Sequence, residues 1–230
     1  MSETSSINGV IVIDKPAGLT SARVVDRVKR LLPRGTKVGH AGTLDPFATG
    51  VLVVLVGKAT KLCEAMMDQP KAYDATLKLG ATTATDDLES PEQITPNAKV
   101  PDRATIDAAL AHFRGTIMQR PPAYSAIKVE GRRAYDLARR GDEVEIKARP
   151  VNVYRIEVVK YQFPLLDLTI DCGRGTYVRS IGRDLGEQLG TGAYLTQLRR
   201  TRVGGYTTQG AVTLESLRRE TILETVRPAQ

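Results

Sequence analysis

The sequence predicts a mixed α and β fold, and three kinds of pattern along the chain carry that prediction. Residues 73–79 and 166–171 alternate apolar with polar side chains, as half-buried strands do. Residues 51–56 are continuously apolar and indicate a buried strand, whereas residues 176–189 place apolar side chains at helical spacing. Because the strands are spaced too irregularly for an alternating array of strands and helices, the predicted class is α+β.

The remaining elements follow from local patterns. Residues 9–13 predict a short buried strand that ends in a turn over residues 14–18. Residues 21–32 predict a helix, with Thr20 or Ser21 as N-cap and several valines along one side. Helices are also expected at 58–67, at 105–114 and near 133–140, and a strand at 151–159. Residues 81–101 are polar and contain three prolines, which predicts turns, and 213–225 predicts a short helical stretch.

The charge of the chain suggests a polyanionic partner such as nucleic acid. The formal net charge is +7 and the isoelectric point is about 9.5, with a strongly basic stretch over residues 120–149. Tryptophan is absent and aromatic residues make up only 5% of the chain, which argues against a broad base-stacking platform. The glycine-rich motifs that bind nucleoside triphosphates and dinucleotides are also absent.

Cysteine and histidine usage predicts neither a disulfide framework nor a metal site. Cys63, Cys172, His40 and His112 are suitable zinc ligands by type, but no two of them are closely spaced in the sequence. The N-terminus lacks the layout of a secretory signal, and no apolar stretch is as long as a membrane span. The expected setting is therefore the reducing cytoplasm.

One segment stands out as a candidate catalytic loop, namely residues 39–52, which read GHAGTLDPFATGVL. Asp45 precedes a proline, which biases it away from helix toward an extended or turn conformation. Three glycines around it allow the backbone to bend and another molecule to approach closely. For an isolated Asp-Pro pair, a turn leading into a strand is the simpler interpretation.

The whole fourteen-residue segment resembles the catalytic motif of the TruB family of pseudouridine synthases, in which the aspartate is the catalytic carboxylate. Further matches extend the resemblance from about Gly9 to Tyr206. It implies a mixed, mainly antiparallel sheet flanked by helices, with the active site in a central cleft. It also implies a single catalytic domain over residues 1–230, with an inserted RNA-gripping loop around 120–149. Family members commonly carry a small C-terminal RNA-binding domain, which is not evident here.

The resemblance assigns roles to residues far from Asp45 in the sequence. Tyr73 matches the active-site tyrosine, Arg179 the arginine beside the catalytic aspartate, and Leu198 a leucine that walls the pocket. Tyr177 lies in the same motif as Arg179, and Asp87 falls where the family carries an acidic residue in a network with that arginine. Without the resemblance, Tyr73 and Leu198 would be interpreted as core residues and Arg179 as part of a solvated helix face. Asp86 is an alternative to Asp87, because the sequence departs from the family pattern here.

Other residues are candidates for contact with RNA. His40 is expected to help to hold the target base out of the stack, with proton transfer and a structural role as alternatives. Lys15 lies in a lysine-proline turn that the family uses structurally, and contact with RNA is its alternative role. In the basic stretch, Lys128, Arg132 and Arg133 are candidate phosphate contacts, with solvated surface charge as the simpler interpretation.

The implied function is the isomerisation of uridine to pseudouridine at position 55 in the T loop of tRNA. This reaction is redox-neutral and is expected to need no cofactor and no metal. The target base must be extruded from its stack to be reached. We expect tRNA as partner, a monomer with no obligatory protein partner, and no membrane association. The alternatives are a guide-RNA-dependent synthase and a non-enzymatic RNA-binding or RNA-folding protein.

Overall fold

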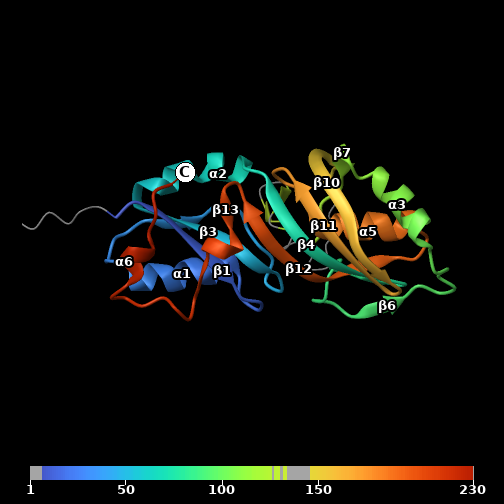
Figure 1. The fold of residues 1–230 in the computed structure, drawn as a ribbon, viewed down its shortest axis with the longest axis horizontal. Coiled ribbons are helices and arrows are strands. Elements are labelled where there is room, and N and C mark those ends of the chain that lie inside the picture. Colours follow the sequence, from blue (N-terminus) through green and yellow to red (C-terminus); the bar gives the residue numbers. More distant parts are fainter. Residues whose placement is uncertain (1–6, 126, 130–131, 134–145, 230) are drawn as a thin grey trace, which may run out of the picture. The chain divides into compact units, whose positions relative to one another are not determined.

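The structure of the chain is a computed structural model, which describes residues 7–125, 127–129, 132–133 and 146–229. The chain forms two compact units (Figure 1). Unit 1 comprises residues 1–73 and 198–230, and unit 2 comprises residues 74–197. Strands β4 (Lys71–Leu79) and β12 (Ala193–Val203) both contain a boundary between the units. The expectation of one catalytic domain over residues 1–230 stays a prediction.

Unit 1 is built on the antiparallel pair β1 (Gly9–Lys15) and β3 (Thr49–Val56). Strand β14 (Val212–Thr213) is parallel to β1, and β2 (Val38–His40) is antiparallel to β3. The C-terminal half of β12 pairs with β3 in parallel and with β13 (Tyr206–Thr207) in antiparallel orientation. The predicted strands at 9–13 and 51–56 are therefore confirmed.

Both faces of this sheet are covered, which explains why the run 51–56 is continuously apolar. Helix α1 (Ser21–Leu31) and the short helix α6 (Ile222–Thr225) lie on one face, where their side chains share a core with Ile11 and Ile13 (Figure 1). On the other face, Met66 of helix α2 (Cys63–Asp68) packs in a cluster with Val10 and Val12. Alternate residues of β1 thus serve two separate cores.

The helices of unit 1 correct two details of the prediction. Helix α1 begins after the N-cap Thr20, whose hydroxyl accepts a hydrogen bond from the Arg23 backbone at 3.2 Å. The predicted helix at 58–67 instead starts as a 3₁₀ helix, η1 (Gly57–Leu62), and becomes α-helical only in α2. The predicted helical stretch at 213–225 contains only α6 after a series of turns, and a second 3₁₀ helix, η2 (Thr208–Gly210), precedes it.

Unit 2 continues with the strand order β12, β4, β11 (Leu165–Cys172), β10 (Arg149–Gln162) and β7 (Gly115–Gln119). Strand β10 is antiparallel to both of its neighbours. Helix α5 (Val178–Gln188) packs on β4 so closely that a Cβ atom on Gly182 would lie 2.7 Å from the Leu77 side chain. The predicted strands at 73–79, 151–159 and 166–171 are confirmed, as is the mainly antiparallel α+β class.

The rest of unit 2 surrounds this sheet. Helix α3 spans Arg103–Ala111 and begins earlier than predicted, because Asp102 caps it by accepting a bond from the Thr105 backbone at 2.7 Å. Two short antiparallel pairs are also present, formed by β5 (Ala81–Thr83) with β6 (Glu92–Ile94) and by β8 (Lys128–Val129) with β9 (Arg132–Arg133). Residues 134–140 of the helix predicted near 133–140 lie outside the described residues. No described helix has the length and apolar character needed to cross a membrane.

Candidate active site

The Asp45 loop of unit 1 is fixed by hydrogen bonds on both sides of the carboxylate. On one side, the Ser21 hydroxyl accepts a bond from the Leu44 amide at 2.9 Å and donates to the Leu44 carbonyl at 3.1 Å. On the other side, the Pro46 carbonyl accepts from the Gly18 amide at 2.8 Å and from the Lys15 ammonium at 3.0 Å. The half-buried Asp45 therefore lies between two anchored neighbours.

Lys15 is a buried structural group, which confirms the structural interpretation of the lysine-proline turn. Its side chain is fully buried, so contact with RNA is contradicted. The ammonium donates to the carbonyls of Pro16 at 2.9 Å, Leu19 at 2.7 Å and Pro46, which uses all three of its donors. Burial lowers the pKa of Lys15 to about 8, although the nearby negative charge of Asp45 opposes this shift.

Arg200 of β12 also anchors the Asp45 loop, and sequence reasoning did not single it out. Its guanidinium is buried and donates to the carbonyls of Val51 at 2.7 Å and of Thr43 and Gly42 at 3.2 Å each. Three carbonyls that bracket Asp45 in the sequence are thereby tied to one rigid, planar group. Gly50 permits the close approach of the β12 backbone to β3, because a Cβ atom there would lie 2.2 Å from the Arg200 carbonyl oxygen.

Arg199, the neighbour of Arg200 on β12, has a contrasting environment. Its side chain is 40% exposed and forms a two-pronged ion pair with Asp14, at 2.7 and 3.1 Å. Strand alternation accounts for the difference, since Leu198 and Arg200 are buried while Arg199 between them is only half-buried. A signal for Arg200 was thus available in the sequence, because it has the same parity along β12 as the predicted pocket residue Leu198.

His40 lies at the end of β2 and is half-buried. Burial lowers its pKa, and the positive charge of Arg200 lowers it further. The imidazole is therefore neutral near pH 7, which suits hydrogen bonding to a nucleobase or acceptance of a proton. Its backbone carbonyl accepts a bond from the Cys63 thiol at 3.5 Å. Contact with RNA stays a prediction, with proton transfer and a structural role as its alternatives.

Tyr73 and Leu198 are both largely buried, at 9% and 7% exposure. Tyr73 is on the apolar face of β4, where its neighbours by alternation, Ala75 and Leu77, are also buried. Their burial fits both a pocket wall and a core position, so their contact with a nucleobase stays a prediction.

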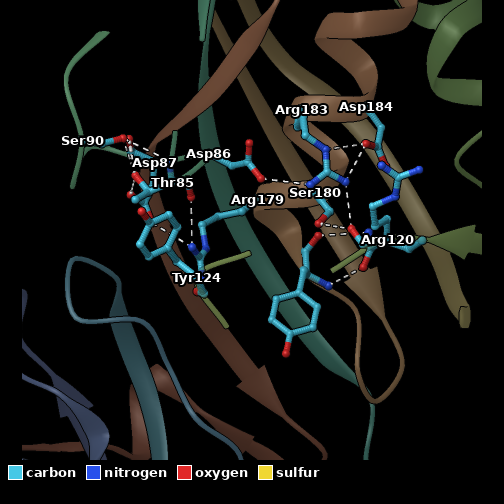
Figure 2. A network of polar contacts seen from close by, with 12 residues as sticks. Thr85, Asp86, Asp87, Ser90, Arg120, Tyr124, Arg179, Ser180, Arg183 and Asp184 are labelled. Carbon is cyan, nitrogen blue, oxygen red and sulfur yellow. Dashed lines mark hydrogen bonds and ion pairs between the residues drawn. The ribbon is translucent and has the colours of Figure 1, made fainter. Parts of the chain in front are cut away.

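Arg179 is the centre of a buried polar network in unit 2 (Figure 2). It lies in the first turn of α5 and donates to the carbonyls of Thr85 and Tyr124, each at 3.0 Å. Its guanidinium also forms an ion pair with Asp87 at 3.2 Å, with side-chain exposures of 5% and 2%. The interpretation of Arg179 as part of a solvated helix face is wrong, whereas the predicted network with Asp87 is present.

Asp87 is held for this ion pair by groups on its own loop. One of its carboxylate oxygens accepts bonds from the Thr85 hydroxyl at 2.6 Å and from the Glu89 amide at 2.9 Å. The other oxygen faces Arg179. Each oxygen of this buried carboxylate therefore has a polar partner, which offsets the cost of removing it from water. The pairing of Arg179 with Asp45 stays a prediction.

Asp86 has a separate partner, so it does not share the role of Asp87. Its side chain pairs with Arg183 of α5 at 3.0 Å, and Arg183 also bonds Asp184 and the Arg120 carbonyl, each at 2.8 Å (Figure 2). Burial raises the pKa of Asp86, while the charge of Arg183 opposes that shift. The two adjacent aspartates thus form ion pairs with two arginines that are one helical turn apart on α5.

The segment before α5 is fixed by Gln119, a residue that sequence reasoning missed. The buried Gln119 side chain accepts a bond from the Tyr177 amide at 2.7 Å and donates to the Tyr177 carbonyl at 3.1 Å. The Arg149 guanidinium lies over the Tyr177 ring, 5.6 Å from its centre, a cation–π arrangement. Tyr177 is therefore held in place, and its predicted role in binding substrate is not tested by these contacts.

The candidate RNA contacts of the basic stretch fall partly on short strands. Lys128 belongs to β8, and Arg132 and Arg133 form β9. Their role as phosphate contacts stays a prediction. Among the residues that the structure describes, no cluster of histidine, cysteine, aspartate or glutamate could hold a metal ion.

Comparison with known proteins gives the class of this chain. The family model of the TruB family pseudouridylate synthase N-terminal domain matches residues 29–178, and that of the tRNA pseudouridylate synthase B C-terminal domain matches residues 179–228. These matches place the chain among the pseudouridylate synthases. Within that class, it belongs to the TruB family.

Individual relatives agree with this assignment. Proteins called tRNA pseudouridine synthase B from Corynebacterium diphtheriae and Mycobacterium tuberculosis are 47% and 48% identical to this chain. The matches cover 94% and 91% of this chain and 74% and 71% of those proteins. Among solved structures, the chain resembles one in a Cbf5-Nop10-Gar1 complex with a TM-score of 0.71 and 30% identity, covering 96% of this chain. It spans only 60% of that solved chain.

Proposed function

We propose that this chain isomerises uridine to pseudouridine at position 55 in the T loop of tRNA, with Asp45 as the catalytic carboxylate. The observation that carries the proposal is the fixing of the Asp45 loop, whose carboxylate is flanked by two anchored residues and has buried Lys15 and Arg200 nearby. Such fixing is expected of a group that must meet a substrate atom in one geometry.

The reaction is balanced without an external donor or acceptor of electrons. The bond between N1 of uracil and C1′ of ribose breaks, the uracil turns, and C5 bonds to C1′. The proton on C5 is then lost, and N1 gains one. Asp45 acts as a nucleophile toward sugar or base, or as a base toward a ribose proton. The target nucleotide must leave its stack, and single-stranded loops permit this at low cost.

The other candidate residues receive roles consistent with their surroundings. Tyr73 and Leu198 form apolar walls for the uracil ring. Arg179, positioned by Asp87, supplies a rigid positive group for the site, and Tyr177 contacts substrate. His40 helps to hold the extruded base. Lys128, Arg132 and Arg133 contact phosphates of the RNA.

We further propose that the chain acts on tRNA alone, as a monomer in the cytoplasm, with no obligatory protein partner. The relatives at 47% and 48% identity are called tRNA pseudouridine synthase B, which supports a tRNA substrate. The structures of H/ACA RNP and Cbf5 proteins, at about 30% identity, favour the second candidate, a guide-RNA-dependent synthase. A third candidate is a non-enzymatic RNA-binding protein.

One experiment separates these candidates. The pure protein is incubated alone with unmodified tRNA transcript, and pseudouridine is mapped by chemical sequencing. Formation at position 55 without any guide RNA is the expected result, and its absence would exclude the proposed activity. Asp45→Asn should bind tRNA near normally but lose more than the roughly 10²–10⁴-fold typical of losing one general acid or base. Substantial turnover by that variant would remove Asp45 from its role.

A further inference from the structure

Helix α1 carries three arginines along one side that the proposed reaction does not use. Arg23, Arg27 and Arg30 are spaced four and three residues apart, so their side chains lie above one another on the helix. All three are exposed, whereas Val24 and Val28 on another side are buried in the core of unit 1. These three residues are here called the α1 basic stripe.

The charge of the stripe is not balanced within the described part of the chain. No ion pair among those residues involves Arg23, Arg27 or Arg30, and Asp26, the one acidic residue of α1, forms none with them. Arg219 adds a fourth guanidinium, which donates to the Arg30 carbonyl at 2.9 Å. Like charges one helical turn apart destabilise a helix by about 0.2–0.5 kcal/mol per pair, and the single acid Asp26, three residues after Arg23 and four before Arg30, offsets only part of this cost.

Two exposed arginines in unit 2 have carboxylate partners and provide a contrast. Arg103 pairs with Asp107 at 2.8 Å, and Arg155 pairs with Glu157 at 2.5 Å. Each of these arginines is about half exposed yet has a carboxylate partner nearby in the sequence. Unlike Arg103 and Arg155, the arginines of the stripe have no carboxylate within ion-pair distance among the described residues.

The stripe begins next to the candidate catalytic loop, and both belong to unit 1. Ser21, the first residue of α1, is hydrogen-bonded to both backbone groups of Leu44, the residue before Asp45. With a rise of about 1.5 Å per residue, the stripe extends roughly 10 Å along the helix from Arg23 to Arg30. The N-terminal end of the stripe is thus tied through Ser21 to the loop at which the target uridine is proposed to bind.

We infer that the α1 basic stripe binds backbone phosphates of the tRNA stem that flanks the target loop. This inference rests on the proposed function, because it takes tRNA as the substrate. Guanidinium groups bind phosphate with two parallel hydrogen bonds, which suits three arginines at regular spacing. Such contacts set the orientation of the RNA and do not read its sequence.

The test compares tRNA binding by the wild type and three variants over a range of salt concentrations. The triple variant Arg23→Gln, Arg27→Gln, Arg30→Gln removes the charge while keeping good helix formers. A matched control, Arg103→Ala with Arg155→Ala, removes paired arginines of similar exposure. A triple arginine-to-lysine variant keeps the charge. Circular dichroism and thermal unfolding verify that each variant is folded.

We expect the slope of log K against log salt concentration to be smaller in magnitude by about two to three units in the glutamine variant. Each contact with a duplex phosphate contributes about 0.9 to this slope. The lysine variant should recover most of this slope, and the control should match the wild type. A slope unchanged in the glutamine variant would overturn the inference. So would an equal loss on a single-stranded RNA of the loop sequence, which lacks the stem.

Failure of the proposed function gives a different result. In that case the wild-type protein forms no pseudouridine in tRNA, while the difference in salt slope between wild type and glutamine variant persists. If the wild type modifies tRNA but the wild type and the glutamine variant have equal salt slopes, the stripe does not bind phosphates and the proposed function stands.

Discussion

Replacing Arg200 by methionine would remove the group that ties three carbonyls around Asp45, with little change in side-chain volume. A buried carbonyl that loses its donor costs about 1–3 kcal/mol, which applies to Val51, whereas the part-buried carbonyls of Thr43 and Gly42 cost less because water can replace the donor. The variant also avoids the desolvation of a buried guanidinium, which offsets part of that loss. We therefore expect a net loss of about 1–3 kcal/mol in the free energy of unfolding.

The expected effect on the reaction is larger than the effect on stability. A displacement of a catalytic group by about 1 Å can cost roughly 10²-fold in rate, and the loop loses its anchor on the β12 side. Denaturant unfolding and single-turnover pseudouridine formation at saturating tRNA would measure the two effects. Arg200→Lys should recover them only in part, because an ammonium lacks the planar fork of donors.

Arg199→Met is the matched control, since Arg199 is adjacent on β12 but 40% exposed. Its ion pair with Asp14 should contribute no more than about 1 kcal/mol, and the rate should stay near that of the wild type. If Arg200→Met has the same unfolding free energy and the same rate as Arg199→Met, the bonds from Arg200 to the three carbonyls do not position the Asp45 loop.

Four further outcomes are expected. Asp87→Asn should destabilise the protein by about 3–5 kcal/mol, measured by urea unfolding, because Arg179 would keep a buried charge without its counter-charge. The unfolding free energy of the wild type relative to Lys15→Met should rise as pH increases from about 8 toward 10.5, because the folded state releases the Lys15 proton before the unfolded chain does. A difference that is constant with pH would contradict the buried environment of that ammonium. Arg132→Ala with Arg133→Ala should lower the salt slope of tRNA binding by about two units, whereas an unchanged slope would leave these residues as surface charge. Turnover should survive exhaustive chelation, and a loss restored by zinc would disprove a metal-free reaction.

Local patterns predicted the elements of this fold better than their ends. The alternation at 73–79 identified β4 and its buried face, and the observed cap Thr20 was one of the two residues predicted for that position. The helix predicted at 58–67 is partly a 3₁₀ helix, because the apolar spacing of a single turn does not distinguish the two hydrogen-bond patterns. Helix α3 starts earlier than predicted because its cap is Asp102, outside the apolar pattern.

The candidate site was predictable where side chains pair with side chains, and less so where they bind the backbone. The link between Arg179 and Asp87 was foreseen from the family resemblance. The bonds from Arg179 to Thr85 and Tyr124, and those from Arg200 to the Asp45 loop, end on carbonyl oxygens. Every residue has a carbonyl, so the sequence contains no signature for such an acceptor.

The burial of the Arg179–Asp87 pair has a consequence for how the enzyme can be studied. Counter-ions screen charges that face water, but they cannot enter a pair whose side chains are only 5% and 2% exposed. Raising the ionic strength should therefore release RNA without loosening this pair. The salt concentration then sets, reversibly, the fraction of protein that has RNA bound. Adding salt at a chosen time releases the product RNA without chemical damage to the protein.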